Sequence, residues 1–512
     1  MANTQDFTKA ILDGYSFASD SILIGAAVLD KHPVANTQVK IPLSVFNRHG
    51  LIAGATGTGK TKTIQHLAES LSEKGVSVLL MDIKGDLSGI AKPGTASDKI
   101  IERHKLIGSE WAPVQLPAEL MSISNEKGLR LRATVSEFGP VLFSKILELN
   151  DNQQGAITIV FKYCDDHSLP LLDIKDFREA LRFLTNEGKS NIAEYGSISS
   201  ATSGVIMRKL LEIEQQGADK FFGEKSFEAE DLLRKDEKGR GFLNIIRLSD
   251  MQDRPKLFST FMLCLLAEVY AKFPEMGDKA APKLVIFIDE AHLIFKEATK
   301  ALMDQLETVV KLVRSKGVGI FFCTQVPSDI PEAVLSQLGS KFQHAMRAFT
   351  AKDRKDIKLV AENYPSTVYY DTDTLITELG IGEAFVTVLN EKGQPTPLVH
   401  TLLSAPRSRM DILTPQEQDD IVSRSSIAAE YNEVIDRKSA YEILTGKINQ
   451  AQQQGQPDEN IQAIPTSKPD EGSGFDLGNA IAAVSKNPLV KQVAKELTRG
   501  LMGALFGGSK RR

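Results

Sequence analysis

Cysteine is scarce in this chain, which has three cysteines in 512 residues. Cys164, Cys264 and Cys323 lie far apart and match no metal-binding or redox spacing. This pattern indicates buried thiols in a reducing compartment.

A secretory signal and a membrane-spanning run are also missing. The first residues, MANTQDFTKA, lack a basic segment followed by an apolar run. The most apolar helix-like stretch, FSTFMLCLLAEVYAKF, contains Glu268 and is too short to cross a bilayer. With 42% hydrophobic and 25% charged residues, the composition is that of a soluble globular protein. We therefore expect a cytoplasmic protein with roughly two to three structural units.

An excess of positive charge is absent as well, because the formal net charge is -5 and the pI is about 6.0. This balance gives no support for a nucleic-acid partner, although it does not exclude a local basic patch or pore.

A glycine-rich loop is the strongest motif in the chain. Residues 51–63 read LIAGATGTGKTKT and match G-x-x-x-x-G-K-[ST]. Glycines let successive backbone N–H groups point at phosphates, and the following helix adds the positive end of its dipole. Lys60 is predicted to reach the β- and γ-phosphates of ATP, and the Thr61 hydroxyl to bind Mg²⁺. The predicted ATP-binding residues are Gly54, Ala55, Thr56, Gly57, Thr58, Gly59, Lys60, Thr61 and Lys62.

The loop lies inside a strand–loop–helix–strand pattern, which disfavours the alternative of a chance glycine-rich turn. After it, apolar residues recur at helical spacing until Gly75, and VSVLLMDIKGD follows with the length and composition of a strand. This βαβ unit predicts an α/β fold with a mostly parallel sheet.

Further strands are predicted downstream. GFLNIIRLSD, KLVIFIDEAH and GVGIFFCTQ are apolar enough for central parallel strands, and KFQHAMRAF is a fourth candidate. GEAFVTVLNEKGQPTPLVHTLL predicts an edge hairpin that turns at residues 391–393. Upstream, SILIGAAVL and VKIPLSVF are predicted to be short strands.

Composition divides the chain into six parts. They are an N-terminal segment (1–49), a P-loop ATPase core (50–94 and 239–405), a mainly helical insertion without good strand signals (95–238), a helical extension (406–448), a disordered linker (449–474) and a basic amphipathic tail helix (475–512). In the tail, leucines and a valine spaced four apart form an apolar stripe, with lysines and an arginine on the roughly opposite face. This helix would fold back on the core, self-associate, or contact an anionic membrane or DNA.

An acidic pair follows the apolar run KLVIFI. Asp289 and Glu290 would emerge at the carboxyl end of a buried strand, where α/β sheets place their ligands. Asp289 is predicted to hold the Mg²⁺ shell and Glu290 to polarise the attacking water. The alternative is an acidic cap on a helix that begins at Ala291.

Polar residues also stand near other predicted strand ends. Gln325 would sense the γ-phosphate or orient the water, or else make a loop hydrogen bond. Arg347, in the predicted strand HAMRAF, would be an arginine finger for a neighbouring subunit or a solvent-facing edge residue. Arg314 is a second candidate for a phosphate or interface contact.

Five ordered motifs resemble the HerA/FtsK superfamily of DNA-pumping ATPases, and bacterial HerA-like ATPases with such a tail most closely. They are RHGLIAGATGTGKT, VLLMDIKGDL, FIDEAH, CTQVPSDIP and AMRAF, and the resemblance covers roughly residues 22–403. It implies a RecA-like core, a homohexameric ring and ATP-driven translocation of double-stranded DNA. It also implies that Gln325 is the sensor and Arg347 the trans arginine finger, and Asp82 and Lys84 match its second-strand motif.

The sequence also bears on a nuclease partner and on two other functions. No N-terminal nuclease-binding barrel is identified, so a fixed nuclease partner is not indicated. The letters DEAH are typical of RNA helicases, but such an enzyme needs a second RecA-like domain after the box, and the sequence does not provide one. The remaining alternative is an ATP-dependent switch or scaffold that remodels a protein partner without moving along DNA.

Overall fold

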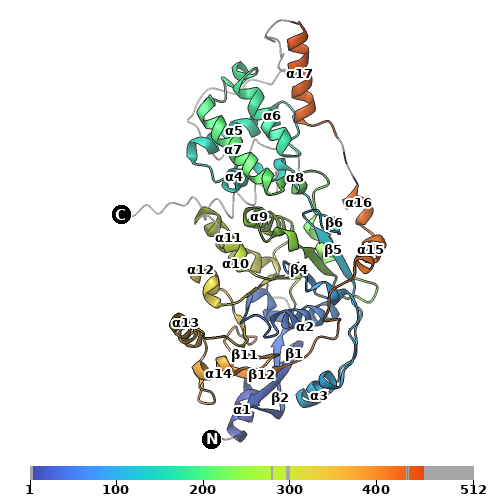
Figure 1. The fold of residues 1–512 in the computed structure, drawn as a ribbon, viewed down its shortest axis with the longest axis vertical. Coiled ribbons are helices and arrows are strands. Elements are labelled where there is room, and N and C mark those ends of the chain that lie inside the picture. The colour runs from blue at the N-terminus through green and yellow to red at the C-terminus, as the bar shows by residue number, and fades with distance from the viewer. Residues whose placement is uncertain (1–3, 278–280, 296–299, 434, 436, 455–512) are drawn as a thin grey trace.

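The computed structural model describes residues 4–277, 281–295, 300–433, 435 and 437–454 (Figure 1). The predicted linker beyond residue 454 and the tail lie outside the described residues. The strands are β1 (Ser21–Leu29), β2 (His32–Pro42), β3 (Gly50–Ala53), β4 (Ser77–Asp82), β5 (Ala118–Ser122), β6 (Leu129–Arg130), β7 (Leu243–Arg247), β8 (Leu284–Ile288), β9 (Val318–Thr324), β10 (Ser340–Gln343), β11 (Glu383–Thr387) and β12 (Val399–Leu403).

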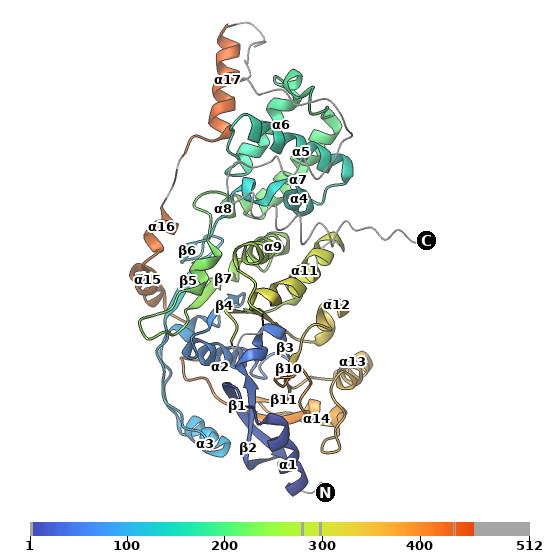
Figure 2. The same ribbon diagram turned by 180° about the vertical axis from the view of Figure 1, so that it is seen from behind.

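Helices lie on both faces of the sheet and at one end of the molecule (Figures 1 and 2). They are α1 (Thr4–Tyr15), α2 (Lys60–Glu73), α3 (Asp98–Ile107), α4 (Val135–Ile146), α5 (Asp151–Asp166), α6 (Ile174–Thr185), α7 (Ser200–Gln215), α8 (Ala218–Phe221), α9 (Pro255–Lys272), α10 (His292–Phe295), α11 (Lys300–Val313), α12 (Glu332–Leu335), α13 (Ala351–Glu362), α14 (Thr372–Glu378), α15 (Pro415–Arg424), α16 (Ala428–Asn432) and α17 (Ala440–Gln454). Within the described part of the chain, no helix has both the length and the apolar character needed to cross a membrane.

All of the strands join one sheet, in the order β2-β1-β12-β11-β10-β3-β9-β8-β4-β7-β5-β6. From β10 to β6 every neighbouring pair is parallel, and from β10 to β2 every pair is antiparallel. The predicted α/β fold with a mostly parallel sheet is thus confirmed.

The central strands are apolar because both of their faces are buried. Every residue of β4, β8 and β9 is buried. Alternate side chains enter opposite layers: Ile286 packs with α9 and α11 on one face, whereas Phe287 packs with α2 on the other. Continuous apolar runs, rather than alternating ones, are what such a two-sided sheet requires.

The predicted hairpin forms from β11 and β12, with Phe385 opposite His400. Its expected place at the edge is wrong, because β1 pairs with β12 and β2 pairs with β1. The predicted strand VKIPLSVF also ends early, since a 3-10 helix covers Leu43–Arg48.

Two short strands lie in the region expected to lack them. Within residues 95–238, β5 pairs with β7 and β6 pairs with β5, so this region extends the sheet. The strand sequence AELMS carries a weak apolar signal, and it is buried through its pairing with β7. The helices α4, α5 and α6 begin at the capping residues Thr134, Asn150 and Asp173. They form a helical group at one end of the molecule, where α17 packs on α6 (Figure 1).

The predicted strand KFQHAMRAF is shorter than expected. The strand β10 ends at Gln343, and residues 344–350 form a loop. The chain stays beside β3 and the glycine loop as far as Ala345, whose carbonyl accepts from the Ala55 N–H at 2.8 Å, and the next N–H, of Met346, donates to the Ile376 carbonyl in α14 at 3.0 Å. Arg347 therefore lies in an exposed loop rather than in a strand.

Candidate functional site

The carboxyl ends of four adjacent strands bring the predicted site residues to one edge of the sheet. In the order β3-β9-β8-β4, these strands lead into the glycine loop, Gln325, the Asp289–Glu290 pair and the DIKGD motif. Because the strands are parallel, residues far apart in the sequence meet at this edge, which is where open α/β sheets bind ligands.

The glycine loop depends on residues without side chains. Gly54, Gly57 and Gly59 have φ values of 150°, 79° and 110°, which side-chain-bearing residues rarely adopt. A Cβ atom at Gly54 would also approach the His344 Cβ at 2.5 Å. The loop leads directly into α2, whose first residues present their backbone N–H groups to the same place.

Lys60 is buried and folds back over this loop. Its Nζ donates to the carbonyls of Gly54 at 2.7 Å and Ala55 at 3.2 Å. The positive charge is thereby held within the glycine loop. By contrast, the Lys62 ammonium donates to the Met410 carbonyl at 2.6 Å, so its side chain is engaged away from the loop.

His344 supports the loop, although no motif in the sequence points to this residue. Its ring lies within hydrogen-bond distance of the Thr63 hydroxyl at 3.0 Å and the Thr58 carbonyl at 3.2 Å. Burial, together with the nearby charge of Lys60, lowers the pKa of His344 to about 4. The neutral ring of His344 therefore lies between the glycine loop and the first turn of α2.

Several carboxylates lie close together beside the first turn of α2. The Thr61 hydroxyl donates to an Asp86 carboxylate oxygen at 3.2 Å. Burial raises the pKa of Asp82 to about 7, and the charges of Asp86 and Asp289 add to this rise. Burial likewise raises the pKa of Asp289 to about 6, with contributions from Glu290 and Asp86 and opposition from Lys84. Such mutual repulsion indicates an environment that a cation would stabilise.

The residues fit a magnesium ion. One carboxylate oxygen of Asp86 and one of Asp289 are buried without a hydrogen-bond partner, and Thr61 supplies a hydroxyl beside them. In the described residues, no group of three or more His, Cys, Asp or Glu side chains forms a metal site by itself. Mg²⁺ at nucleotide sites is typically held by one or two protein oxygens together with phosphate oxygens and water.

Glu290 has an uncommon backbone conformation, and its carboxylate lies beside Lys84 and His292. Its φ of 46° lies in the left-handed region, which is uncommon for a residue other than glycine. One carboxylate oxygen forms an ion pair with Lys84, and the other lies 3.1 Å from Nδ1 of His292. The side chain is almost fully buried at the strand end.

The remaining predicted residues, Gln325, Arg347 and Arg314, have exposed side chains. Gln325 has an exposed side chain, and its carbonyl accepts a hydrogen bond from the Gly54 N–H at 3.2 Å, so it adjoins the glycine loop. Arg347 and Arg314 are exposed, Arg347 in the loop after β10 and Arg314 after α11. The structure thus gathers Lys60, Thr61, Asp289 and Glu290 and leaves Arg347 on the surface.

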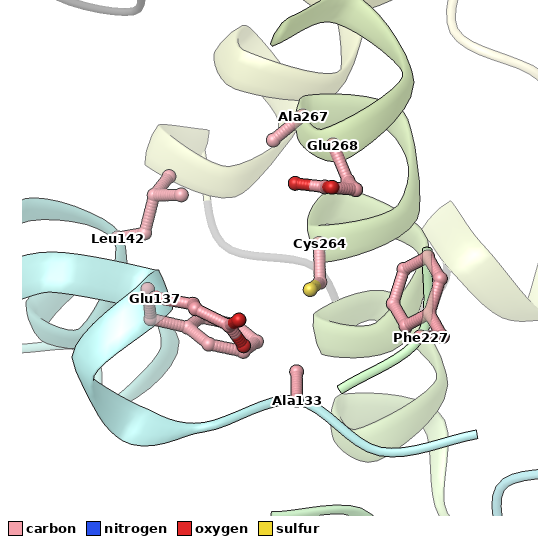
Figure 3. A pocket seen from close by; sticks show the side chains of 8 residues that line it. Ala133, Glu137, Leu142, Phe227, Cys264, Ala267 and Glu268 are labelled. Atoms are coloured by element: carbon pink, nitrogen blue, oxygen red, sulfur yellow. The ribbon is translucent and has the colours of Figure 1, made fainter. Parts of the chain in front are cut away.

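A separate small pocket lies between α4 and α9 (Figure 3). The side chains of Glu137, Cys264 and Glu268 line it together with apolar residues. Burial raises the pKa of Glu268 to about 7, Lys272 opposes this rise, and Glu137 adds to it. None of the glycine-loop residues lines this pocket.

Comparisons with known proteins agree on one family. The family model "Helicase HerA-like C-terminal" matches residues 28–512. The DNA double-strand break repair helicase HerA of Sulfolobus acidocaldarius is 21% identical over 372 residues, which cover 69% of this chain and 64% of that protein. The HerA protein of Pyrococcus furiosus is 22% identical over 410 residues, which cover 72% of this chain and 68% of that protein. The chain therefore spans just under two thirds of the length of the Sulfolobus relative.

Solved structures are more distant. The bacterial conjugative coupling protein TrwB aligns with a TM-score of 0.49 at 15% identity, covering 79% of this chain and 94% of that one. VirB4 of Thermoanaerobacter pseudethanolicus aligns with a TM-score of 0.47 at 15% identity, covering 79% and 99%. The family match includes the glycine loop and the Asp289–Glu290 strand, and it shows that this chain belongs to the helicase HerA-like C-terminal family.

Proposed function

We propose that this protein is an ATP-hydrolysing ring motor of the HerA/FtsK type that binds and translocates double-stranded DNA. The observation that carries the proposal is that Lys60 and Thr61, which follow β3, share one sheet edge with Asp289 and Glu290, which follow β8, with only β9 between the two strands. Phosphate binding and carboxylate chemistry at one sheet edge are the two requirements of an ATPase.

Each residue has a proposed part in hydrolysis. The backbone N–H groups of the glycine loop and the Lys60 ammonium bind the β- and γ-phosphates. Thr61 and Asp289 hold Mg²⁺, which supplies charge neutralisation at the phosphate oxygens. Glu290 accepts a proton from the attacking water, and Gln325 orients that water from the end of β9.

Arg347 is proposed to act on the ATP of a neighbouring subunit. Its exposure in the loop after β10 leaves the guanidinium accessible to a second copy of the chain. This arrangement supports a homo-oligomer, with a hexamer as the number that the family resemblance implies. Arginine supplied in trans stabilises charge that develops on the transferred phosphoryl group.

DNA is the proposed substrate because the HerA relatives are named as DNA double-strand break repair helicases. The alternative is a switch or scaffold that remodels a protein partner, which the pI of about 6.0 favours mildly. The deciding experiment measures ATP turnover with and without duplex DNA over a series of salt concentrations. A motor is expected to be stimulated, with stimulation that fades as salt rises, because phosphate contacts release counterions. Turnover that is indifferent to DNA and responds to a protein partner would support the alternative.

The predicted tail, residues 475–512, is proposed to contribute to assembly or partner binding rather than to hydrolysis. The test compares a chain truncated before Phe475 with the full chain in ATP turnover, particle size, and DNA and liposome binding. Basal turnover is expected to persist while assembly or binding changes. Loss of basal turnover in a soluble truncated protein would mean that the tail is part of the catalytic core.

A further inference from the structure

A lysine from the neighbouring strand end holds the carboxylate of Glu290. Lys84 follows β4 and Glu290 follows β8, two adjacent parallel strands in which Met81 lies opposite Ile288. The two side chains form an ion pair across this sheet edge. Lys84 comes from the DIKGD motif, whose function the sequence left undefined.

The two side chains of this ion pair differ in how far they are exposed to solvent. The Glu290 side chain is 6% exposed, whereas the Lys84 side chain is 36% exposed. A buried carboxylate has few ways to satisfy its charge, and of its two neighbours, Lys84 and His292, the lysine supplies the permanent positive charge. The lysine, in contrast, reaches in from the surface and contributes little to the apolar core.

Other carboxylates make the lysine more important. One carboxylate oxygen of Asp289 is buried without a hydrogen-bond partner, and the negative charge of Asp289 acts on Lys84 as that of Glu290 does. Asp289 precedes Glu290 directly in the chain. Without a cation between the strands, like charges would push the Glu290 side chain away from the orientation that it has here.

We propose that Lys84 is a positioning residue that fixes the carboxylate of Glu290 for attack by water on ATP. This inference rests on the proposed role of Glu290 in hydrolysis. Lys84 itself is not required to touch ATP, so its loss is expected to slow turnover while nucleotide binding remains.

The test compares Lys84→Met and Lys84→Arg with the wild type in ATP turnover and in ADP affinity. Lys84→Met is expected to lower kcat by about 10- to 100-fold, as misplacement of a catalytic group does, with KM and ADP affinity nearly unchanged. Lys84→Arg keeps the cation and is expected to retain most of the turnover.

Lys127→Met is the matched control. Lys127 forms an ion pair with Asp419 at 2.6 Å, in which both side chains are about half exposed. This lysine lies in the loop between β5 and β6, so its substitution is expected to leave turnover unchanged. Thermal melting of all variants separates loss of folding from loss of positioning, and Lys84→Gln replaces Lys84→Met if the latter fails to fold.

Three outcomes would overturn the role of Lys84. They are wild-type kcat in Lys84→Met, a faster rate in that variant, and a fall in ADP affinity as large as the fall in kcat. The failure of the proposed function looks different, since Glu290→Gln alone would then hydrolyse ATP at the wild-type rate.

Discussion

The hydroxyl of Thr61 donates a hydrogen bond to Asp86 at 3.2 Å, and the second carboxylate oxygen of Asp86 is buried without a partner. This contact joins the first turn of α2 to the loop after β4. It places a carboxylate from the DIKGD motif beside the residue that the glycine-loop pattern assigns to Mg²⁺. The sequence motifs assign no metal-binding role to Asp86, which the fold brings to Thr61.

Asp86→Asn tests whether this carboxylate contributes to Mg²⁺ binding. Substitutions around metal sites commonly weaken metal affinity by about 10- to 100-fold. We expect a rise of that order in the Mg²⁺ concentration needed for half-maximal binding of a fluorescent ADP analogue. Binding of the analogue without Mg²⁺ should change little. An unaltered Mg²⁺ requirement would leave Asp86 with a purely structural hydrogen bond to Thr61.

Lys60→Ala and Glu290→Gln should separate binding from hydrolysis. The first substitution removes the phosphate-binding ammonium, so it should weaken nucleotide affinity and abolish turnover. The second keeps the shape of the side chain but removes its basicity, so ATP should bind and remain uncleaved. Filter binding of labelled ATP and release of labelled phosphate measure the two properties. Wild-type hydrolysis by Glu290→Gln would contradict its assignment as the water-activating group.

Arg347→Ala should bind ATP normally and hydrolyse it slowly, because removal of an arginine finger costs on the order of 10³-fold or more in turnover. If the arginine acts in trans, mixing this variant with Lys60→Ala should restore part of the activity. In such rings, an intact Arg347 faces an intact ATP site at some interfaces. Absence of rescue, in assemblies proven to have exchanged subunits, would argue against a trans role.

Glu268→Gln should change the pH dependence of stability. The pKa of Glu268 is raised to about 7 in the folded protein, chiefly by burial, so the folded state binds this proton more tightly than the unfolded state. Its contribution to stability is therefore fully present below the unfolded pKa, which is about 4.3. It is lost as the pH rises toward 7. The Tm of the variant relative to the wild type should increase between pH 5 and pH 7.5, which is roughly this window.

Glu237→Gln is the control for this measurement, since Glu237 is exposed. Its Tm relative to the wild type should be nearly constant across the same pH range. A constant difference for Glu268→Gln as well would mean that the carboxyl group of Glu268 does not retain its proton in the pocket between α4 and α9.

The sequence by itself determined the parts of the protein whose signals are local. Glycines at fixed spacing predict the phosphate loop, because only they adopt the required φ values without strain. Continuous apolar runs predict β4, β8 and β9, because a parallel strand is buried on both faces. The acidic pair after such a run predicts where Asp289 and Glu290 emerge.

The tertiary structure decided what depends on contacts between distant segments. AELMS becomes β5 because β7 offers it a pairing edge, and the strand in KFQHAMRAF is short because the chain then bonds elsewhere, with the Met346 N–H donating to the Ile376 carbonyl in α14. The pairing of Lys84 with Glu290 likewise follows from β4 and β8 being neighbours in the sheet. Strand order and long-range hydrogen bonds have no local signature, so only the folded chain brings these residues together.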